Sequence, residues 1–219
     1  SEIELISEED TWSRPYLVDF DGDGTVEILN MYDNNTGNLY TIDHNGKLVK
    51  SNGFDFGTSY YCMGDFNADG KTDVITMGTT SKPDTGWEMN FSTGITGENE
   101  KSFVSEAITS LFNPKNKQIF VADINGDGFD DLYVVGEKTN KNQTCPVNIY
   151  INDRTGKTFS HYTGSNTVGT DKANFRIADF NGDGKADFIC YPNSKGSSVP
   201  ISLHVSTNTG GNALTSVTD

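Results

Sequence analysis

The sequence has few of the residues that zinc, nucleic-acid and membrane proteins need. Its 219 residues include three cysteines, none in a Cys-x-x-Cys pair, which argues against a zinc site and predicts three buried, unpaired thiols. Lys and Arg total 16 against 31 Asp and Glu, so the clustered positive charge that binds phosphates is missing. No apolar run reaches the roughly 18 residues that a membrane-spanning helix requires. A nucleic-acid partner and membrane insertion are therefore not expected.

Signs of catalysis are also sparse. His44, His161 and His204 are isolated in the sequence, and each fits a surface or strand histidine better than a catalytic base. No nucleophile elbow, P-loop or His-Glu-x-x-His motif occurs. Paired carboxylates are the signature of glycoside hydrolysis, but here they lie within single short loops, which favours shared metal coordination. We expect no enzymatic activity.

Short acidic loops are what the sequence does contain. In the stretch 179–187, oxygen-bearing side chains occupy positions one, three, five and nine, and glycines occupy positions four and six. Alternate side chains of such a loop point inward as ligands, and the glycines permit a tight wrap around a hard cation. The carbonyl oxygen at position seven supplies one more ligand. The stretch therefore predicts a cation-binding loop.

The loop occurs four times, with starts 46, 58 and 56 residues apart, which is the period of a repeat architecture. The pattern predicts about four bound Ca²⁺ ions, each held by side chains at positions one, three, five and nine and by the carbonyl at position seven. The predicted ligands are Asp19, Asp21, Asp23, Thr25 and Glu27 in the first loop; Asp65, Asn67, Asp69, Lys71 and Asp73 in the second; Asp123, Asn125, Asp127, Phe129 and Asp131 in the third; and Asp179, Asn181, Asp183, Lys185 and Asp187 in the fourth.

Calcium is favoured over the alternatives. An EF-hand needs a bidentate Glu at position twelve between two helices, whereas that position holds Asn30, Thr76, Val134 and Cys190. Transition metals prefer His or Cys, which are absent from the loops, and Mg²⁺ suits a flexible shell of many carboxylates poorly. Asx-Gly turns without a metal are the simplest alternative, but clustered carboxylates would then repel one another. Four bound Ca²⁺ would bring the formal net charge from −15 to about −7.

Short segments rich in Val, Ile and aromatic residues flank every loop and predict strands. Residues 100–112 also suit a short amphipathic helix, although a fourth strand after a longer loop is favoured there. Four strands per repeat are typical of β-propeller blades, so we predict an all-β, single-domain β-propeller over residues 1–219. Its blades are expected at approximately 12–56, 57–112, 113–166 and 167–219, with a spare strand at residues 3–6.

The repeats resemble FG-GAP/VCBS repeats, the family of the integrin α-subunit propeller. The second repeat carries the likeness best, with Phe56-Gly57, Gly64 to Asn67, Asp69-Gly70, Asp73 to Ile75 and Gly78. The Gly-Ala-Pro ending of the family is replaced by Gly78-Thr79-Thr80 and by Gly136-Glu137-Lys138, so the resemblance rests on the metal loop and strand pattern. It covers about residues 12–219. A weaker likeness, at residues 87–94 and 203–210, is to repeats of bacterial RHS and Tc-toxin-type secreted proteins.

The resemblance implies a calcium-stabilised propeller that works outside the cytoplasm, secreted or at the cell surface, in protein or glycan binding, scaffolding or cell adhesion. A lectin-like propeller and an accessory domain of a larger secreted toxin or enzyme are the alternatives. The four blades form either a closed ring or an arc of a larger propeller, and we favour the arc. An open arc exposes apolar faces on its end blades, so self-association through these blades is expected.

Overall fold

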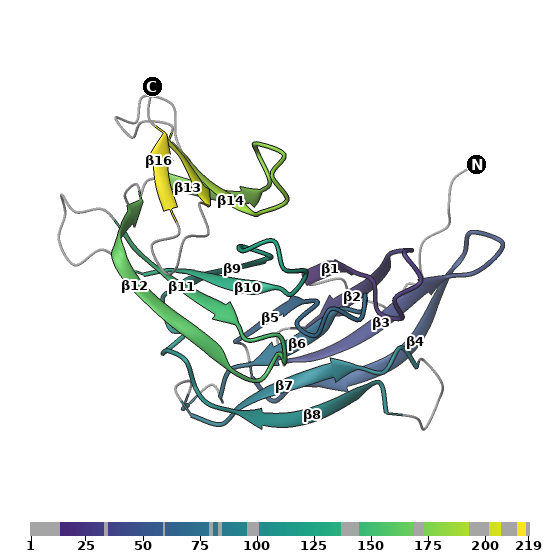
Figure 1. Cartoon of the computed structure of the whole chain (residues 1–219). Coiled ribbons are helices and arrows are strands. Elements are labelled where there is room, and N and C mark those ends of the chain that lie inside the picture. Colours follow the sequence, from purple (N-terminus) through teal and green to yellow (C-terminus); the bar gives the residue numbers. More distant parts are fainter. Residues whose placement is uncertain are drawn as a thin grey trace. The chain divides into compact units, whose positions relative to one another are not determined.

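The computed structural model describes residues 14–32, 35–58, 60–78, 81–82, 85–95, 101–136, 145–168, 173–192, 202–206 and 214–217. The predicted spare strand at residues 3–6 lies outside them. Among the described residues, every regular element is a strand, and none is a helix long and apolar enough to cross a membrane. The sixteen strands form four antiparallel sheets of four, each from consecutive strands, as drawn in Figure 1. The all-β prediction and the four-stranded repeats are confirmed, and each sheet is called a blade below.

The first compact unit of the chain comprises residues 1–65 and 69–113 and contains two blades. The first blade is ordered β1-β2-β3-β4 and the second β5-β6-β7-β8. Residues 103–108 form a strand, so the strand alternative for residues 100–112 is the correct one. The strands are β1 (Arg14–Val18), β2 (Glu27–Met31), β3 (Thr36–Ile42), β4 (Leu48–Asp55), β5 (Tyr61–Gly64), β6 (Asp73–Thr76), β7 (Trp87–Ser92) and β8 (Phe103–Ile108).

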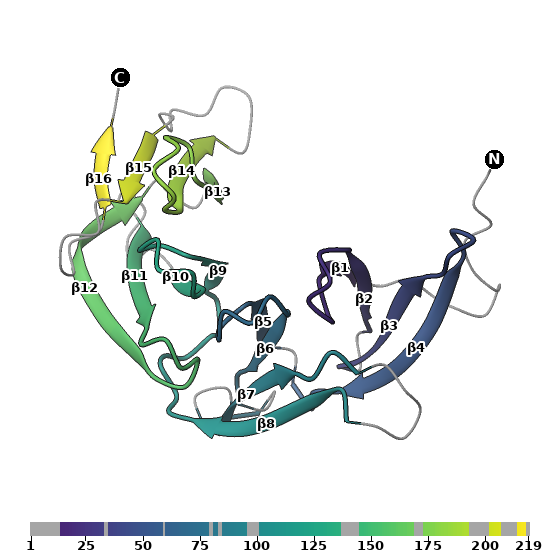
Figure 2. The same cartoon turned by 45° about the vertical axis from the view of Figure 1, so that its right-hand side comes forward.

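The second unit comprises residues 66–68 and 114–219 and contains the third and fourth blades, ordered β9-β10-β11-β12 and β13-β14-β15-β16. Figure 2 shows the four strands of the last blade side by side. The strands are β9 (Gln118–Ala122), β10 (Asp131–Val135), β11 (Cys145–Asn152), β12 (Phe159–Val168), β13 (Ala173–Ala178), β14 (Asp187–Pro192), β15 (Ser202–Ser206) and β16 (Leu214–Val217).

Each unit has its core between its two blades. Successive side chains of a strand point to opposite faces of the sheet, so alternate apolar residues of each blade face the other blade of the unit. In the first unit, Phe20, Leu29 and Leu39 of the first blade pack with Tyr61 and Met63 of the second. We call the face of a blade that packs on the next blade its trailing face, and the opposite face its leading face.

The second unit repeats this arrangement with different side chains. Tyr133 and Ile149, on the trailing face of the third blade, pack with Phe175, Ile177 and Phe188, on the leading face of the fourth. The rings of Phe175 and Phe188 lie 5.3 Å apart, centroid to centroid. All three cysteines are buried and form no disulfide, as predicted.

Candidate metal centre

All four acidic loops connect the first two strands of a blade. The last residue pair of each hairpin joins position nine to the residue before the loop: Val18 with Glu27, Gly64 with Asp73, Ala122 with Asp131, and Ala178 with Asp187. The sheet therefore holds position nine beside the start of the loop. These are hairpin loops between strands, as the flanking residues predicted, and the helices of an EF-hand are not there.

The carboxylate at position one organises the turn of each loop. In the fourth loop, Oδ1 of Asp179 accepts the N–H of Gly182 at 2.7 Å and Oδ2 accepts the N–H of Gly184 at 2.9 Å. The first and third loops form the same pair of bonds, through Asp19 and Asp123. These N–H bonds lower the pKa of the Asp179 carboxyl and so favour its ionised form, against a smaller opposing effect of burial.

The glycines are required by the backbone of the loops. In the first, third and fourth loops, positions four and six have φ between +77° and +90°, a region that L-residues with a side chain rarely adopt. The second loop has Ala68 at position four with φ +58°. A left-handed conformation costs a residue with a Cβ about 1–2 kcal/mol, so this loop carries strain that the others avoid.

Side chains at positions three and five continue the same pattern. Oδ1 of Asn181 accepts the N–H of Asp183 at 2.9 Å, and Oδ1 of Asp183 accepts the N–H of Lys185 at 3.0 Å. In the first loop, Asp23 accepts both the N–H and the hydroxyl of Thr25, which lowers the pKa of its carboxyl. An oxygen that accepts one N–H keeps a lone pair, and both bonds from Thr25 fall on Oδ1 of Asp23 and leave its Oδ2, so the side chains remain able to ligate a cation.

The carboxylate at position nine is buried in all four loops. Asp131 accepts the N–H of Ile124, at position two, with Oδ2 at 3.0 Å, and the N–H of Asn152, at the end of β11, with Oδ1 at 2.7 Å. Asp187 bonds Phe180 and Ser206 in the same way. Position nine of these two loops thus ties the loop to the third strand of its blade.

Burial raises the pKa of the Asp131 carboxyl to about 7, because desolvation disfavours its charge. The backbone N–H bonds lower the pKa, and the neighbouring carboxylates of Asp127 and Asp123 raise it again. The pKa of Glu27 is raised for the same first reason, burial, and by the charges of Asp21, Asp19 and Asp23. A cation among these carboxylates would offset both the burial and the mutual repulsion.

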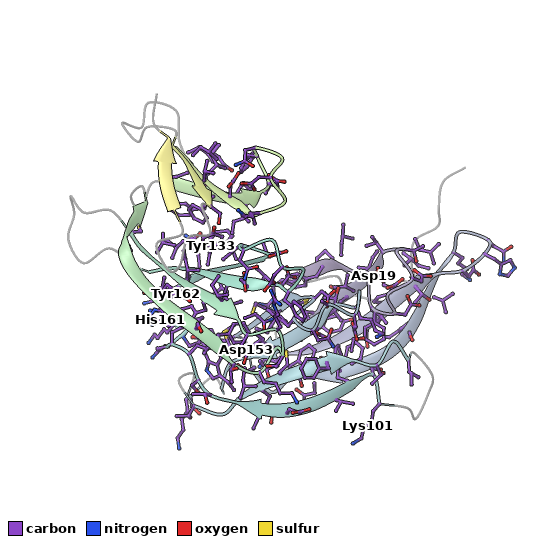
Figure 3. The ribbon with its side chains drawn as sticks, in the orientation of Figure 1. Asp19, Lys101, Tyr133, Asp153, His161 and Tyr162 are labelled. Atoms are coloured by element: carbon purple, nitrogen blue, oxygen red, sulfur yellow. The ribbon has the colours of Figure 1, made fainter. Side chains whose placement is uncertain are left out.

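The first loop brings three carboxylates together. Asp19, Asp21 and Glu27 each offer an oxygen, and these atoms lie within 4.8 Å of one another, the one such group of three acidic, His or Cys side chains in the described part of the chain. Figure 3 shows Asp19 in the loop that follows β1. Ligands 2.3–2.6 Å from a common Ca²⁺ are separated by distances of about this size, so the group fits the ion.

Two loops hold a basic side chain against position five. In the second loop, Nζ of Lys71 lies 2.8 Å from Oδ2 of Asp69. In the third, Nε of Arg154 lies 3.0 Å from Oδ2 of Asp127, and Arg154 comes from the turn between β11 and β12. The sequence pattern did not identify Arg154, because it lies 27 residues from its partner.

A polar residue at the end of the third strand was also missed. Ser92 donates its hydroxyl to the carbonyl of Phe20 at 2.7 Å, Asn152 donates its amide to that of Phe66 at 2.7 Å, and Ser206 its hydroxyl to that of Ile124 at 2.7 Å. The acceptor is each time position two of the preceding loop. This side chain lies two residues beyond the cross-strand partner of position ten, a register that only the structure gives.

Fold and site together define a repeat protein of four-stranded propeller blades, each with an acidic hairpin loop. Comparison with family models finds the FG-GAP-like repeat three times, over residues 19–76, 65–134 and 123–190. Each match begins at position one of a loop and runs past the following loop. The chain therefore belongs to the family of FG-GAP-like repeat proteins, as the resemblance predicted. Comparison with curated proteins gave no match.

Proposed function

We propose that this chain is a calcium-binding propeller module in which Ca²⁺ rigidifies the hairpin loops of the blades. The observation that carries the proposal is the acidic group of the first loop, where oxygens of Asp19, Asp21 and Glu27 approach one another within 4.8 Å. All donors are hard oxygens, which suits Ca²⁺ and disfavours softer metals. The other three loops repeat the spacing with an Asn at position three, so they take the same ion with one carboxylate fewer.

The residues would act in distinct ways. Positions one, three and five would supply side-chain oxygens, and position seven its carbonyl. Among the residues at position nine, Glu27 would be the most available ligand, because only one of its oxygens accepts a backbone N–H, from Phe20 at 2.7 Å. At Asp131 and Asp187 both oxygens already accept one N–H each, so a cation there would use their remaining lone pairs.

Calorimetric titration of chelated protein tests the proposal. Ca²⁺ should bind with measurable heat at or below millimolar concentration, and Zn²⁺ should not compete. Glu27→Gln should remove the tightest of the binding events, whereas Glu88→Gln, an exposed residue of β7, is the matched control with the same loss of charge. Absence of heat with millimolar Ca²⁺, or a preference for Zn²⁺, would reject calcium binding.

We further propose an extracellular role in binding a protein or a glycan, without enzymatic activity. The support is membership of the FG-GAP-like repeat family together with loops whose weak oxygen sites suit the millimolar calcium outside cells. A glycan array, probed with calcium-loaded protein, separates a lectin from a protein-binding module. Saturable binding to one glycan class would establish the lectin alternative.

A further inference from the structure

One serine, at the end of the third strand of the second blade, bonds two loops at once. The hydroxyl of Ser92 donates to the carbonyl of Phe20, position two of the first loop, at 2.7 Å. Its backbone N–H donates to Oδ1 of Asp73, position nine of the second loop, at 2.9 Å. The N–H of Phe20 in turn donates to Oε2 of Glu27, position nine of the first loop, at 2.7 Å. Ser92 and Phe20 thus link the position-nine carboxylates of two neighbouring loops.

The second unit repeats this link. Ser206, at the end of β15, donates its hydroxyl to the carbonyl of Ile124 at 2.7 Å and its N–H to Oδ1 of Asp187 at 2.9 Å. The N–H of Ile124 donates to Oδ2 of Asp131 at 3.0 Å. The residues at positions two and nine of the first loop differ from those of the third, whereas the serine is the same in both units. We call the first and third loops the earlier loops, and the second and fourth the later loops.

Both serines are buried in their unit. Ser92 is 5% and Ser206 1% exposed, and the carbonyls that accept their hydroxyls are buried with them. A buried carbonyl that loses its donor has no water to replace it, so such a bond is costly to break. Each hydroxyl therefore holds position two of the earlier loop against the residue that bonds position nine of the later loop.

The two loops of a unit are also bonded directly, by their backbones. The N–H of Thr72, at position eight, donates to the carbonyl of Asp19, at position one, at 2.7 Å, and the N–H of Ala186 donates to that of Asp123 at 2.8 Å. Two successive carbonyls of each earlier loop, at positions one and two, thus accept hydrogen bonds from the later blade. Position one carries the carboxylate that organises the earlier loop.

We propose that Ser92 and Ser206 are positioning residues that couple the two loops of each unit, so that filling one loop with Ca²⁺ raises the affinity of the other. This inference rests on the calcium-binding role proposed above. Position nine of a filled later loop would hold the serine more firmly, and the serine would hold position two of the earlier loop. The earlier loop would then lose less conformational freedom when it binds its own ion, which is positive coupling. By linkage, a filled earlier loop raises the affinity of the later loop by the same factor.

Electrostatic repulsion opposes this coupling. Two divalent ions in neighbouring loops repel each other, and the first ion removes negative charge that attracts the second. Both effects act through space and do not require the serine hydroxyl. A variant that lacks the hydroxyl therefore separates the proposed coupling from the electrostatic effect.

Site-resolved titration of chelated, ¹⁵N-labelled protein by NMR tests the coupling in the first unit. The amides of Gly24 and Gly70, at position six, report Ca²⁺ binding to the first and second loops. Asp21→Lys removes a ligand and places an ammonium in the first loop, so this loop should no longer bind, and the Gly24 amide verifies that. The substitution adds as much positive charge as one Ca²⁺ does, so the charge near the second loop resembles that of the filled native protein.

Blocking the first loop should raise the Ca²⁺ midpoint of the second loop about fivefold, which is the lower end of typical coupling between sites. In Ser92→Ala the backbone N–H still bonds position nine, but the hydroxyl is lost. The same block in that background should therefore raise the midpoint less than twofold. Ser102→Ala is the matched control, because Ser102 is also buried and donates its hydroxyl within the second blade, to the carbonyl of Ile95. It should leave the fivefold effect intact, and Ser92→Thr, which keeps a hydroxyl, should restore it.

Hydrogen exchange gives a second measurement that does not depend on affinity. In Asp21→Lys, the Phe20 amide should exchange more slowly once the second loop fills, and this protection should be lost when Ser92→Ala is added. Should Ser92→Ala fail to fold, Ser206→Ala with Asp127→Lys gives the same test in the second unit.

Two negative results are distinguishable. Amides that do not respond to millimolar Ca²⁺ would reject calcium binding itself, and the coupling with it. A second loop that binds with the same midpoint whether the first is filled or blocked, or an undiminished effect in Ser92→Ala, would overturn the coupling through the serine while calcium binding stands.

Discussion

The first and third loops share one spacing but use position nine differently. Asp131 accepts two backbone N–H groups and ties its loop to the end of β11. Glu27 accepts one N–H, from Phe20, and its other oxygen lies 3.4 Å from the hydroxyl of Thr25, inside the loop. One additional methylene thus leaves a carboxylate oxygen inside the loop instead of on the third strand. The same position bonds the third strand in one repeat and, under the calcium-binding role proposed above, would be more available as a ligand in the other.

The carboxylate at position five also has different partners in the first and third loops. Asp23 of the first loop accepts two hydrogen bonds from Thr25, which is neutral. Asp127 of the third loop is paired with the cationic Arg154. A metal ion entering the third loop would compete with a guanidinium, whereas the first loop offers an additional carboxylate, Asp21, where the third has Asn125. We therefore expect the first loop to bind Ca²⁺ more tightly than the third.

Removal of calcium should give the largest effect. A ligand that binds only the folded state stabilises it by about 2.7 kcal/mol per site at a hundredfold excess over its Kd, which is roughly 5–10 °C in Tm for a chain of this size. Chelator should lower the Tm of the native chain by at least this amount, and by less in Glu27→Gln. Scanning calorimetry with and without chelator measures both. An unchanged Tm would mean that the loops need no ion.

Asp131→Ala tests the structural half of the comparison. Two buried N–H groups, of Ile124 and Asn152, lose their acceptor, so the free energy of unfolding should fall by about 3–5 kcal/mol even in chelator. In Glu27→Ala one buried N–H group, that of Phe20, loses its acceptor, so the free energy of unfolding should fall by about 1–2 kcal/mol under the same conditions. Chemical denaturation of both variants in chelator gives the difference. Equal losses would show that position nine has the same structural role in both loops.

Replacing the glycine at position four in the third and fourth loops separates the cost of backbone strain from the cost of a clash with the neighbouring loop. A Cβ on Gly126 would lie 3.2 Å from Cγ of Lys185 and 3.3 Å from the carbonyl oxygen of Gly184, whereas a Cβ on Gly182 would meet nothing within 4 Å. Both residues have positive φ. Gly182→Ala should therefore cost about 1–2 kcal/mol of strain, and Gly126→Ala more than that. Denaturation midpoints of the two variants measure these losses of stability. A greater loss of stability in Gly182→Ala than in Gly126→Ala would contradict the close approach of the third and fourth loops.

Arg154→Gln should produce the smallest change, a gain in calcium affinity of the third loop of about two- to fivefold. Arg154 is exposed, so its ion pair with Asp127 is screened by water and contributes at most about 1 kcal/mol. Lys101→Gln, at another exposed position, is the control with the same change of charge. Calorimetry of both variants in a Glu27→Gln background reports the weaker sites. Equal affinities would show that Arg154 does not compete with the ion.

The loops and strands were predictable because their causes are local. A positive φ selects glycine, alternating Asp and Asn accept N–H groups two residues ahead, and Val, Ile and aromatic residues form the flanking strands. These features repeat in the sequence, so the four loops and the four strands of each repeat could be predicted, and the loop and strand pattern carried the resemblance to the family. The sequence left two alternatives for the strand at 103–108, because a short apolar pattern also suits a helix.

Only the tertiary structure decided what each position nine contacts and which basic residue reaches a loop. Asp131 meets Asn152 and Asp127 meets Arg154 through the folding of β11 and its turn, at separations that no local pattern encodes. The sequence alone determined the local hydrogen-bonding and backbone preferences of each repeat, whereas contacts between strands and blades depend on the packing of distant segments.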